Sequence, residues 1–285
     1  HCHLDQNSFN IYKLWQLAID SGLYGDDFSG SHWCNYYSRT IAHNTITVYD
    51  PSEKFLGYER SRLANDGGQK IMLWQNGERV VPENYSQPDP SLPITWLQHP
   101  GSWETGNIKA YKLTDDYCYV AGDATKAYSA HKLNKFIRQI LFIFPDYFVV
   151  MDTVEAVNPN FVKKWLLHTV NEPKIEKDEI IAADGSGKLY CKALYPSGAV
   201  ITKVGGEDNA FFVKDKNYPH NDELFAGNIP GKWRIEIMPA KPQNKDLFLN
   251  FLCASEISRE TMPRVEKIES DSGIGLTMEL DGLTW

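Results

Sequence analysis

The sequence has few cysteines, no long apolar run and a shortage of positive charge. Its five cysteines are scattered over 285 residues without a CxxC pair, which excludes a disulfide framework and a cysteine-based zinc finger. No apolar run approaches the roughly 20 residues that a membrane-spanning helix needs. The net charge of -8 argues against nucleic-acid binding, because no basic stripe is present. An anionic small molecule or glycan stays compatible, since a few cations inside a cleft can outweigh the mean field.

Aromatic residues and short alternating segments are abundant instead. The chain holds 15 Tyr, 13 Phe and 8 Trp, residue types that favour strands. Residues 44–49 alternate strictly, and the apolar runs 135–144 and 147–152 flank Pro145-Asp146, which is typical of a hairpin. We therefore predict an all-β protein, a large antiparallel β-sandwich. We expect one such domain over residues 1–255, with 256–285 holding strands that begin or border a further β layer.

The first fifty residues contain a concentration of metal-binding side chains. His1 and His3 lie two positions apart, which places them on one face if the segment is extended. Asp20 and His43 follow at a distance. Imidazole nitrogens and a carboxylate oxygen form a donor set that suits zinc. A polar cluster of this kind, with adjacent tyrosines nearby, could equally serve acid–base chemistry.

Several motifs resemble those of a known family. They are HxHxDxNSF at 1–9, LAIDSGxY at 17–24, YxRTxAHNT at 37–45, GDATKAY at 122–128, FPDYFVVMD at 144–152 and KWLLH at 164–168. In this order they resemble the C-terminal region of the heparinase II/III family of polysaccharide lyases. Members of that family have an N-terminal (α/α) toroid followed by β-sandwich layers. The resemblance therefore implies that this chain is the β half of a longer protein whose toroid is absent here.

The resemblance also implies roles for four residues of the first fifty. His1 matches a histidine of the catalytic cleft. His3, Asp20 and His43 match the residues that hold a zinc ion in heparinase II-like members. We expect this zinc to be structural, because a β-elimination already has its own base. Asp5 and Asn7 alternate with the histidines and are expected to orient them.

Five further residues are predicted to contact the substrate. Tyr24, Tyr36 and Tyr37 lie in segments that line the cleft of the family, and His168 matches a histidine near it. Arg39 could bind a sulfate or carboxylate of the substrate with two hydrogen bonds. An ion pair between Arg39 and a neighbouring carboxylate is the open alternative.

The activity implied by the resemblance is β-elimination on a glycan that contains uronic acid, with heparin or heparan sulfate as the favoured substrate class. The partners are an anionic polysaccharide and the toroid of the same protein. The toroid supplies the catalytic tyrosine and the group that neutralises the uronate carboxylate, so this fragment is expected to be inactive without it. The family further implies a periplasmic or secreted location in bacteria.

Two alternatives remain open on the sequence. One is a non-catalytic carbohydrate-binding or structural β-sandwich module that uses zinc as a staple. The other is a zinc-dependent hydrolase with a metal-activated water.

Overall fold

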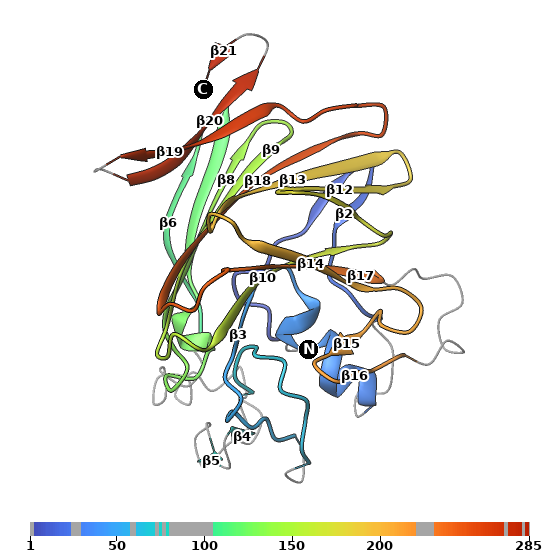
Figure 1. Ribbon diagram of the computed structural model, residues 1–285, viewed down its shortest axis with the longest axis vertical. Helices are drawn as coiled ribbons and strands as arrows, with labels where there is room; N and C mark the ends of the chain where they lie inside the picture. Colours follow the sequence, from blue (N-terminus) through green and yellow to red (C-terminus); the bar gives the residue numbers. More distant parts are fainter. Residues whose placement is uncertain are drawn as a thin grey trace, which may run out of the picture.

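The computed structural model describes residues 3–23, 30–57, 61–71, 74–75, 78–79, 105–220, 231–270, 273–280 and 283–284, and its elements are almost all strands (Figure 1). The helical turns are η1 (Trp33–Tyr37), η2 (Thr40–Ala42) and η4 (Thr125–Ala127). The strands are β1 (Ile11–Lys13), β2 (Trp15–Ala18), β3 (Ile46–Tyr49), β4 (Trp74–Gln75), β5 (Glu78–Arg79), β6 (Asn107–Leu113), β7 (Tyr117–Asp123), β8 (Leu133–Ile143), β9 (Tyr147–Ala156), β10 (Val162–Thr169), β11 (Lys174–Glu176), β12 (Glu179–Asp184), β13 (Gly187–Tyr195), β14 (Val200–Gly205), β15 (Phe212–Val213), β16 (Lys216–Asn217), β17 (Trp233–Met238), β18 (Lys245–Glu256), β19 (Arg264–Ser270), β20 (Gly273–Leu280) and β21 (Leu283–Thr284).

The largest sheet has eight antiparallel strands in the order β11-β12-β13-β18-β9-β8-β7-β6. The predicted hairpin is confirmed: β8 and β9 pair with Ile143 opposite Tyr147, so that Pro145 and Asp146 lie in the turn. Proline presets the backbone for such a turn and cannot donate to a ladder. The strands of this hairpin are among the longest that the structure describes, and both have neighbouring strands on either side in the sheet.

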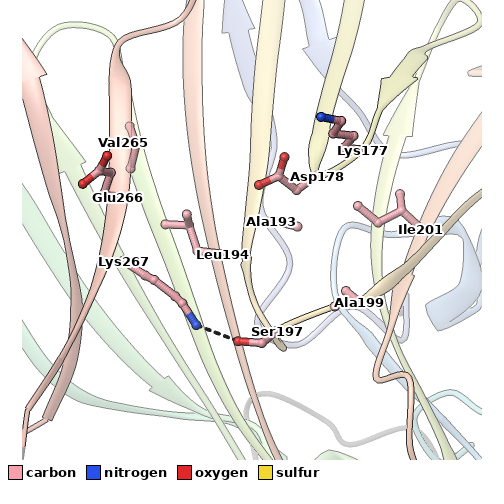
Figure 2. A pocket seen from close by; sticks show the side chains of 11 residues that line it. Lys177, Asp178, Ala193, Leu194, Ser197, Ala199, Ile201, Val265, Glu266 and Lys267 are labelled. Atoms are coloured by element: carbon pink, nitrogen blue, oxygen red, sulfur yellow. Dashed lines mark hydrogen bonds between the residues drawn. The ribbon is translucent and has the colours of Figure 1, made fainter.

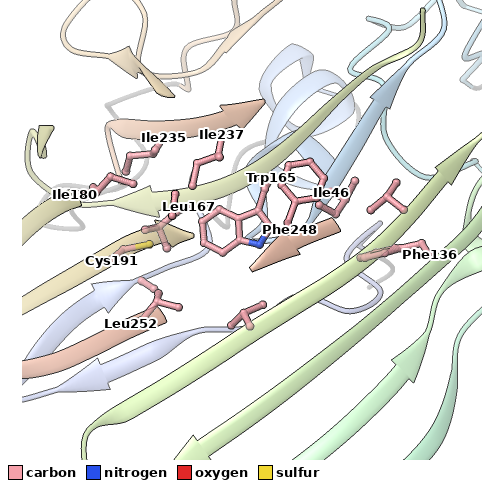
Figure 3. Packing of buried hydrophobic residues seen from close by; sticks show 14 of the residues in the cluster. Ile46, Phe136, Trp165, Leu167, Ile180, Cys191, Ile235, Ile237, Phe248 and Leu252 are labelled. Atoms are coloured by element: carbon pink, nitrogen blue, oxygen red, sulfur yellow. The ribbon is translucent and has the colours of Figure 1, made fainter. Parts of the chain in front are cut away.

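A second sheet of four antiparallel strands, β14-β17-β10-β3, faces the first. The main core fills the space between them, with Trp165 and Leu167 of β10 packed among Phe136 of β8 and Phe248 of β18 (Figure 3). All four residues are fully buried, at 0% exposure. Two sheets that bury one face each against a common core form a sandwich, so the predicted fold class is confirmed.

A third sheet, β19-β20-β21, covers part of the outer face of the eight-stranded sheet. Val265 of β19 and Met278 of β20 are buried against Leu249 and Phe251 of β18. This layer falls in the range where further strands were predicted. In the described part of the chain, no helix is long and apolar enough to span a membrane.

Candidate metal centre

The candidate site lies where β3 begins and β10 ends. Thr45 accepts a backbone hydrogen bond from Leu166 of β10, and this fixes the loop that carries His43. Asp20 lies two residues after the end of β2, and the intervening Ile19 donates its N–H to the carbonyl of His168. The sheet therefore brings two chain segments together that are about twenty positions apart in the sequence.

The segment before β1 completes the site. The N–H of Leu4 donates to the carbonyl of Ser38 at 3.0 Å, and the hydroxyl of Thr40 donates to the carbonyl of Leu4 at 2.8 Å. These bonds place His3 and Asp5, on either side of Leu4, beside the loop of His43. The rings of His3 and His43 have centroids 5.2 Å apart.

Three potential ligands, His3, Asp5 and Asp20, surround His43, which is itself the fourth. One donor atom each of His3, Asp5 and His43 lies within 4.8 Å of the other two. The Nδ1 atom of His43 is 3.0 Å from a carboxylate oxygen of Asp20. The Nε2 atom of His43 is buried and has no hydrogen-bond partner within the described residues. The structure thus gathers two of the three predicted zinc ligands, His3 and His43, in one cluster with Asp5, to which the sequence had assigned an orienting role. The third, Asp20, lies beside His43 and is not part of that cluster.

These donors fit a divalent cation. A buried imidazole nitrogen without a partner is costly, and a bound cation would remove that cost. Asp20 can act in either of two ways. Two ligands of one tetrahedral zinc lie about 3.3 Å apart, close to the observed spacing of Asp20 and His43. A carboxylate on one nitrogen of an imidazole also commonly orients a histidine that binds metal through the other nitrogen.

The protonation states also suit cation binding. Burial lowers the pKa of His3, and the neighbouring His43 lowers it further. For Asp20, burial raises the pKa. The hydrogen bond from His43 and the electrostatic attraction to that imidazole lower the pKa, and the net result is a pKa below the usual value. At neutral pH the site therefore offers a neutral imidazole at His3 and a charged carboxylate at Asp20, the forms that bind metal.

The other predicted site residues lie elsewhere or are enclosed. His1 and Tyr24 fall outside the described residues. Arg39 is buried, forms a 2.5 Å ion pair with Asp66 and lies over the ring of Phe55. The alternative of an ion pair with a neighbouring carboxylate therefore describes Arg39, whose buried guanidinium offers almost no surface to a substrate.

Tyr36, Tyr37 and His168 are also buried, at 0%, 3% and 0% exposure. The Tyr36 hydroxyl donates to the hydroxyl of Ser21, and the Nε2 atom of His168 lies 2.9 Å from the carbonyl of Ile41. Burial lowers the pKa of His168 well below its usual value, with Arg234 adding to the effect. These three side chains have almost no surface for a ligand, in contrast to their predicted contact with the substrate.

A cavity of about 640 Å³ lies away from these residues, between the turn that follows β11, the turn that follows β13 and the strand β19 (Figure 2). Lys177, Asp178, Ser197 and Lys267 contribute polar groups to it, and Lys267 donates a hydrogen bond to Ser197. Among the residues that the structure describes, no predicted site residue lines this cavity. It is therefore distinct from the candidate metal centre.

Comparison with known proteins identifies a matching family and structures with a similar fold. The model of the family described as "Heparinase II/III-like, C-terminal" matches residues 1–224. The crystal structure of the heparan sulfate lyase HepC from Pedobacter heparinus is similar, with a TM-score of 0.61 and 14% identity over 100% of this chain and 36% of that chain. A structure described as a heparinase III has a TM-score of 0.61 and 12% identity, with the same coverage. The chain thus spans about a third of the length of these lyases. No curated protein sequence matches it.

Proposed function

Since the chain belongs to the heparinase II/III-like C-terminal family, we propose that it forms the β-sandwich part of a polysaccharide lyase that cleaves a uronic-acid-containing glycan by β-elimination. The family match over residues 1–224 carries this proposal. The favoured substrate is heparan sulfate or a glycan like it, the substrate named for one similar structure. A periplasmic or secreted location goes with such a substrate.

The reaction removes the proton at C5 of the uronic acid and expels the sugar oxygen at C4. A base must reach C5, an acid must reach O4, and the carboxylate must be neutralised or hydrogen-bonded so that charge can develop at C5. We assign His1 to proton transfer, because its ordinary pKa lies near neutral pH. The remaining groups would come from the toroid, the partner domain that the resemblance to the family implies.

We further propose that His3, Asp20 and His43 hold a zinc ion, with Asp5 within reach as a further carboxylate. The clustering of His3, Asp5 and His43 and the contact between Asp20 and His43 support this assignment. Asp20 would bind the ion directly if the ion lies on Nδ1 of His43, and it would orient the ring if the ion lies on the unpartnered Nε2. The zinc ion would supply a cross-link between three chain segments and a local positive charge.

The test uses the intact protein that contains this chain. Purified enzyme is incubated with heparan sulfate, other uronic-acid glycans and a neutral glycan, and the ultraviolet absorbance of the new C4–C5 double bond is followed. We expect product from a uronic-acid glycan only, and a loss of at least a hundredfold in rate for His1→Ala, within the range that positioned proton transfer contributes. His131→Ala, at an unrelated histidine, serves as the matched control.

Each alternative function predicts a different result. A carbohydrate-binding module would retain glycan without forming unsaturated product, even with its toroid present. A zinc hydrolase would release products that have a reducing end but no double bond, and chelation would stop it at once. Either result with active, folded protein would overturn the proposed lyase.

A further inference from the structure

We propose that Asn44 is a positioning residue of the candidate metal centre. Its buried side-chain amide, supported by Arg138, fixes the spacing between the segments that carry His3, Asp20 and His43. The inference rests on the cation site proposed above, but Asn44 itself contacts no cation in this scheme.

The amide of Asn44 joins three segments at one point. Its Nδ2 atom donates to the carbonyl of Phe9 at 2.8 Å and to the carbonyl of Ile19 at 3.0 Å. Its Oδ1 atom accepts the N–H of His168 at 2.7 Å. Ile19 immediately precedes Asp20, Phe9 belongs to the segment of His3 and Asp5, and Asn44 itself follows His43. A single planar group therefore connects every segment that contributes a candidate ligand.

Arg138 binds the backbone of two of the same segments. Its Nη1 atom donates to the carbonyl of Asn44 and to the carbonyl of Asn7, both at 2.6 Å. Its Nε and Nη2 atoms each bind a carboxylate oxygen of Asp152 at 2.7 Å. The two-bond pair with Asp152 keeps the guanidinium in one orientation. The rigid β8–β9 hairpin thereby fixes the backbone on both sides of the site.

Removing the Asn44 amide should therefore separate the ligands rather than merely weaken the core. Without it, the part-buried carbonyl of Phe9 and the buried carbonyl of Ile19 lose a donor, and relaxation toward other donors would move both segments. Metal affinity depends steeply on such geometry, because a ligand set that must be assembled at binding loses the advantage of being preformed. Groups of this kind around metal ligands typically change affinity by about 10- to 100-fold when mutated.

The experiment measures zinc affinity of the intact protein and of Asn44→Ala by competition with a chromophoric chelator, with the visible spectrum of bound Co²⁺ as a second readout. Asn65→Ala is the matched control. The Asn65 amide also donates to two loop carbonyls, those of Asp50 at 2.8 Å and Glu53 at 3.1 Å, but it joins no ligand segment. Thermal unfolding in chelator sets a temperature at which all variants are folded.

We expect the zinc dissociation constant to rise about 10- to 100-fold for Asn44→Ala, with a changed Co²⁺ spectrum, and to change less than about twofold for Asn65→Ala. If Asn44→Ala does not fold, Asn44→Ser, which keeps one hydroxyl donor, is measured and should show a smaller rise. Wild-type affinity and spectrum in the folded Asn44 variant would overturn the inference, as would equal losses in both variants.

A separate readout keeps this inference distinct from the proposed zinc site. Imidazole nitrogen NMR of the metal-free protein reports the hydrogen bond between Nδ1 of His43 and Asp20. We expect that signal to shift in Asn44→Ala and to stay in place in Asn65→Ala. If the wild-type protein binds no zinc, the zinc proposal fails and this spectrum alone decides the role of Asn44: an unshifted signal would overturn it.

Discussion

The Nδ1 atom of His43 lies 3.0 Å from a carboxylate oxygen of Asp20, while the Nε2 atom across the ring is buried without a partner among the described residues. One side of this imidazole is thus held by an anion, and the other side is available. A proton on Nδ1 leaves the Nε2 lone pair free for a cation, and a cation between His43 and Asp20 would replace that proton. Asp20 is required in both arrangements.

The first prediction follows from this requirement. We expect Asp20→Asn to raise the zinc dissociation constant at least tenfold, because the amide is a weaker ligand and a weaker acceptor for the imidazole N–H. Isothermal titration of the metal-free protein measures the change. Asp215→Asn, at an 81% exposed side chain, is the control. An unchanged dissociation constant for Asp20→Asn would exclude both roles. A loss beyond a hundredfold for Asp5→Asn would place Asp5 among the ligands.

A second prediction concerns pH. Zinc ligation requires neutral imidazoles, so protons compete with the metal as the pH falls. Because burial and the neighbouring His43 lower the pKa of His3, this competition should begin below the usual titration range of histidine. We expect zinc to be released below about pH 6. Metal content after dialysis across pH 5 to 8 provides the measurement, and full occupancy at about pH 5 would contradict the assignment.

A third prediction separates a buried ion pair from an exposed one. Arg138→Met leaves Asp152 buried without its cation and should lower the free energy of unfolding by about 3–5 kcal/mol. The exposed pair of Lys174 and Glu176 is the control, because Lys174→Met should cost less than about 1 kcal/mol. Urea denaturation of the two variants gives both values. Equal costs would show that the Arg138 pair is not a structural anchor.

A fourth prediction concerns acid stability. Burial raises the pKa of Glu236, but Arg234 and Lys164 lower it more, so the folded value lies below the unfolded one. The stabilisation is therefore present above the unfolded pKa and is lost as the pH falls through the folded pKa. We expect Glu236→Gln to lower stability at neutral pH and to flatten the acid limb below about pH 4.5. Denaturation midpoints between about pH 3 and pH 7 test this. A variant whose acid limb is as steep as that of the wild type would contradict the prediction.

The sequence predicted the fold better than the orientation of individual side chains. Alternation and a proline turn are local signals. They were sufficient to predict the hairpin in which one strand ends at Ile143 and the next begins at Tyr147. The motifs also pointed to His3 and His43, which lie in one cluster, and to Asp20, which contacts His43. A motif does not state which way a side chain points. Arg39 points inward because it pairs with Asp66, 27 positions later. This pairing was not predictable, because Asp66 belongs to no recognised motif. Asn44 does belong to a motif, but its contribution was hidden because its closest partners are backbone atoms of distant residues.

The hydrogen bond from Arg138 to the carbonyl of Asn7 joins residues 131 positions apart. Closing so long a loop is entropically unfavourable until the intervening strands have paired. The candidate metal centre around His3 and His43 should accordingly be one of the last parts of the chain to form during refolding. A metal ion added at the start would then find no preformed place to bind, and its uptake should trail the appearance of sheet structure in a stopped-flow experiment.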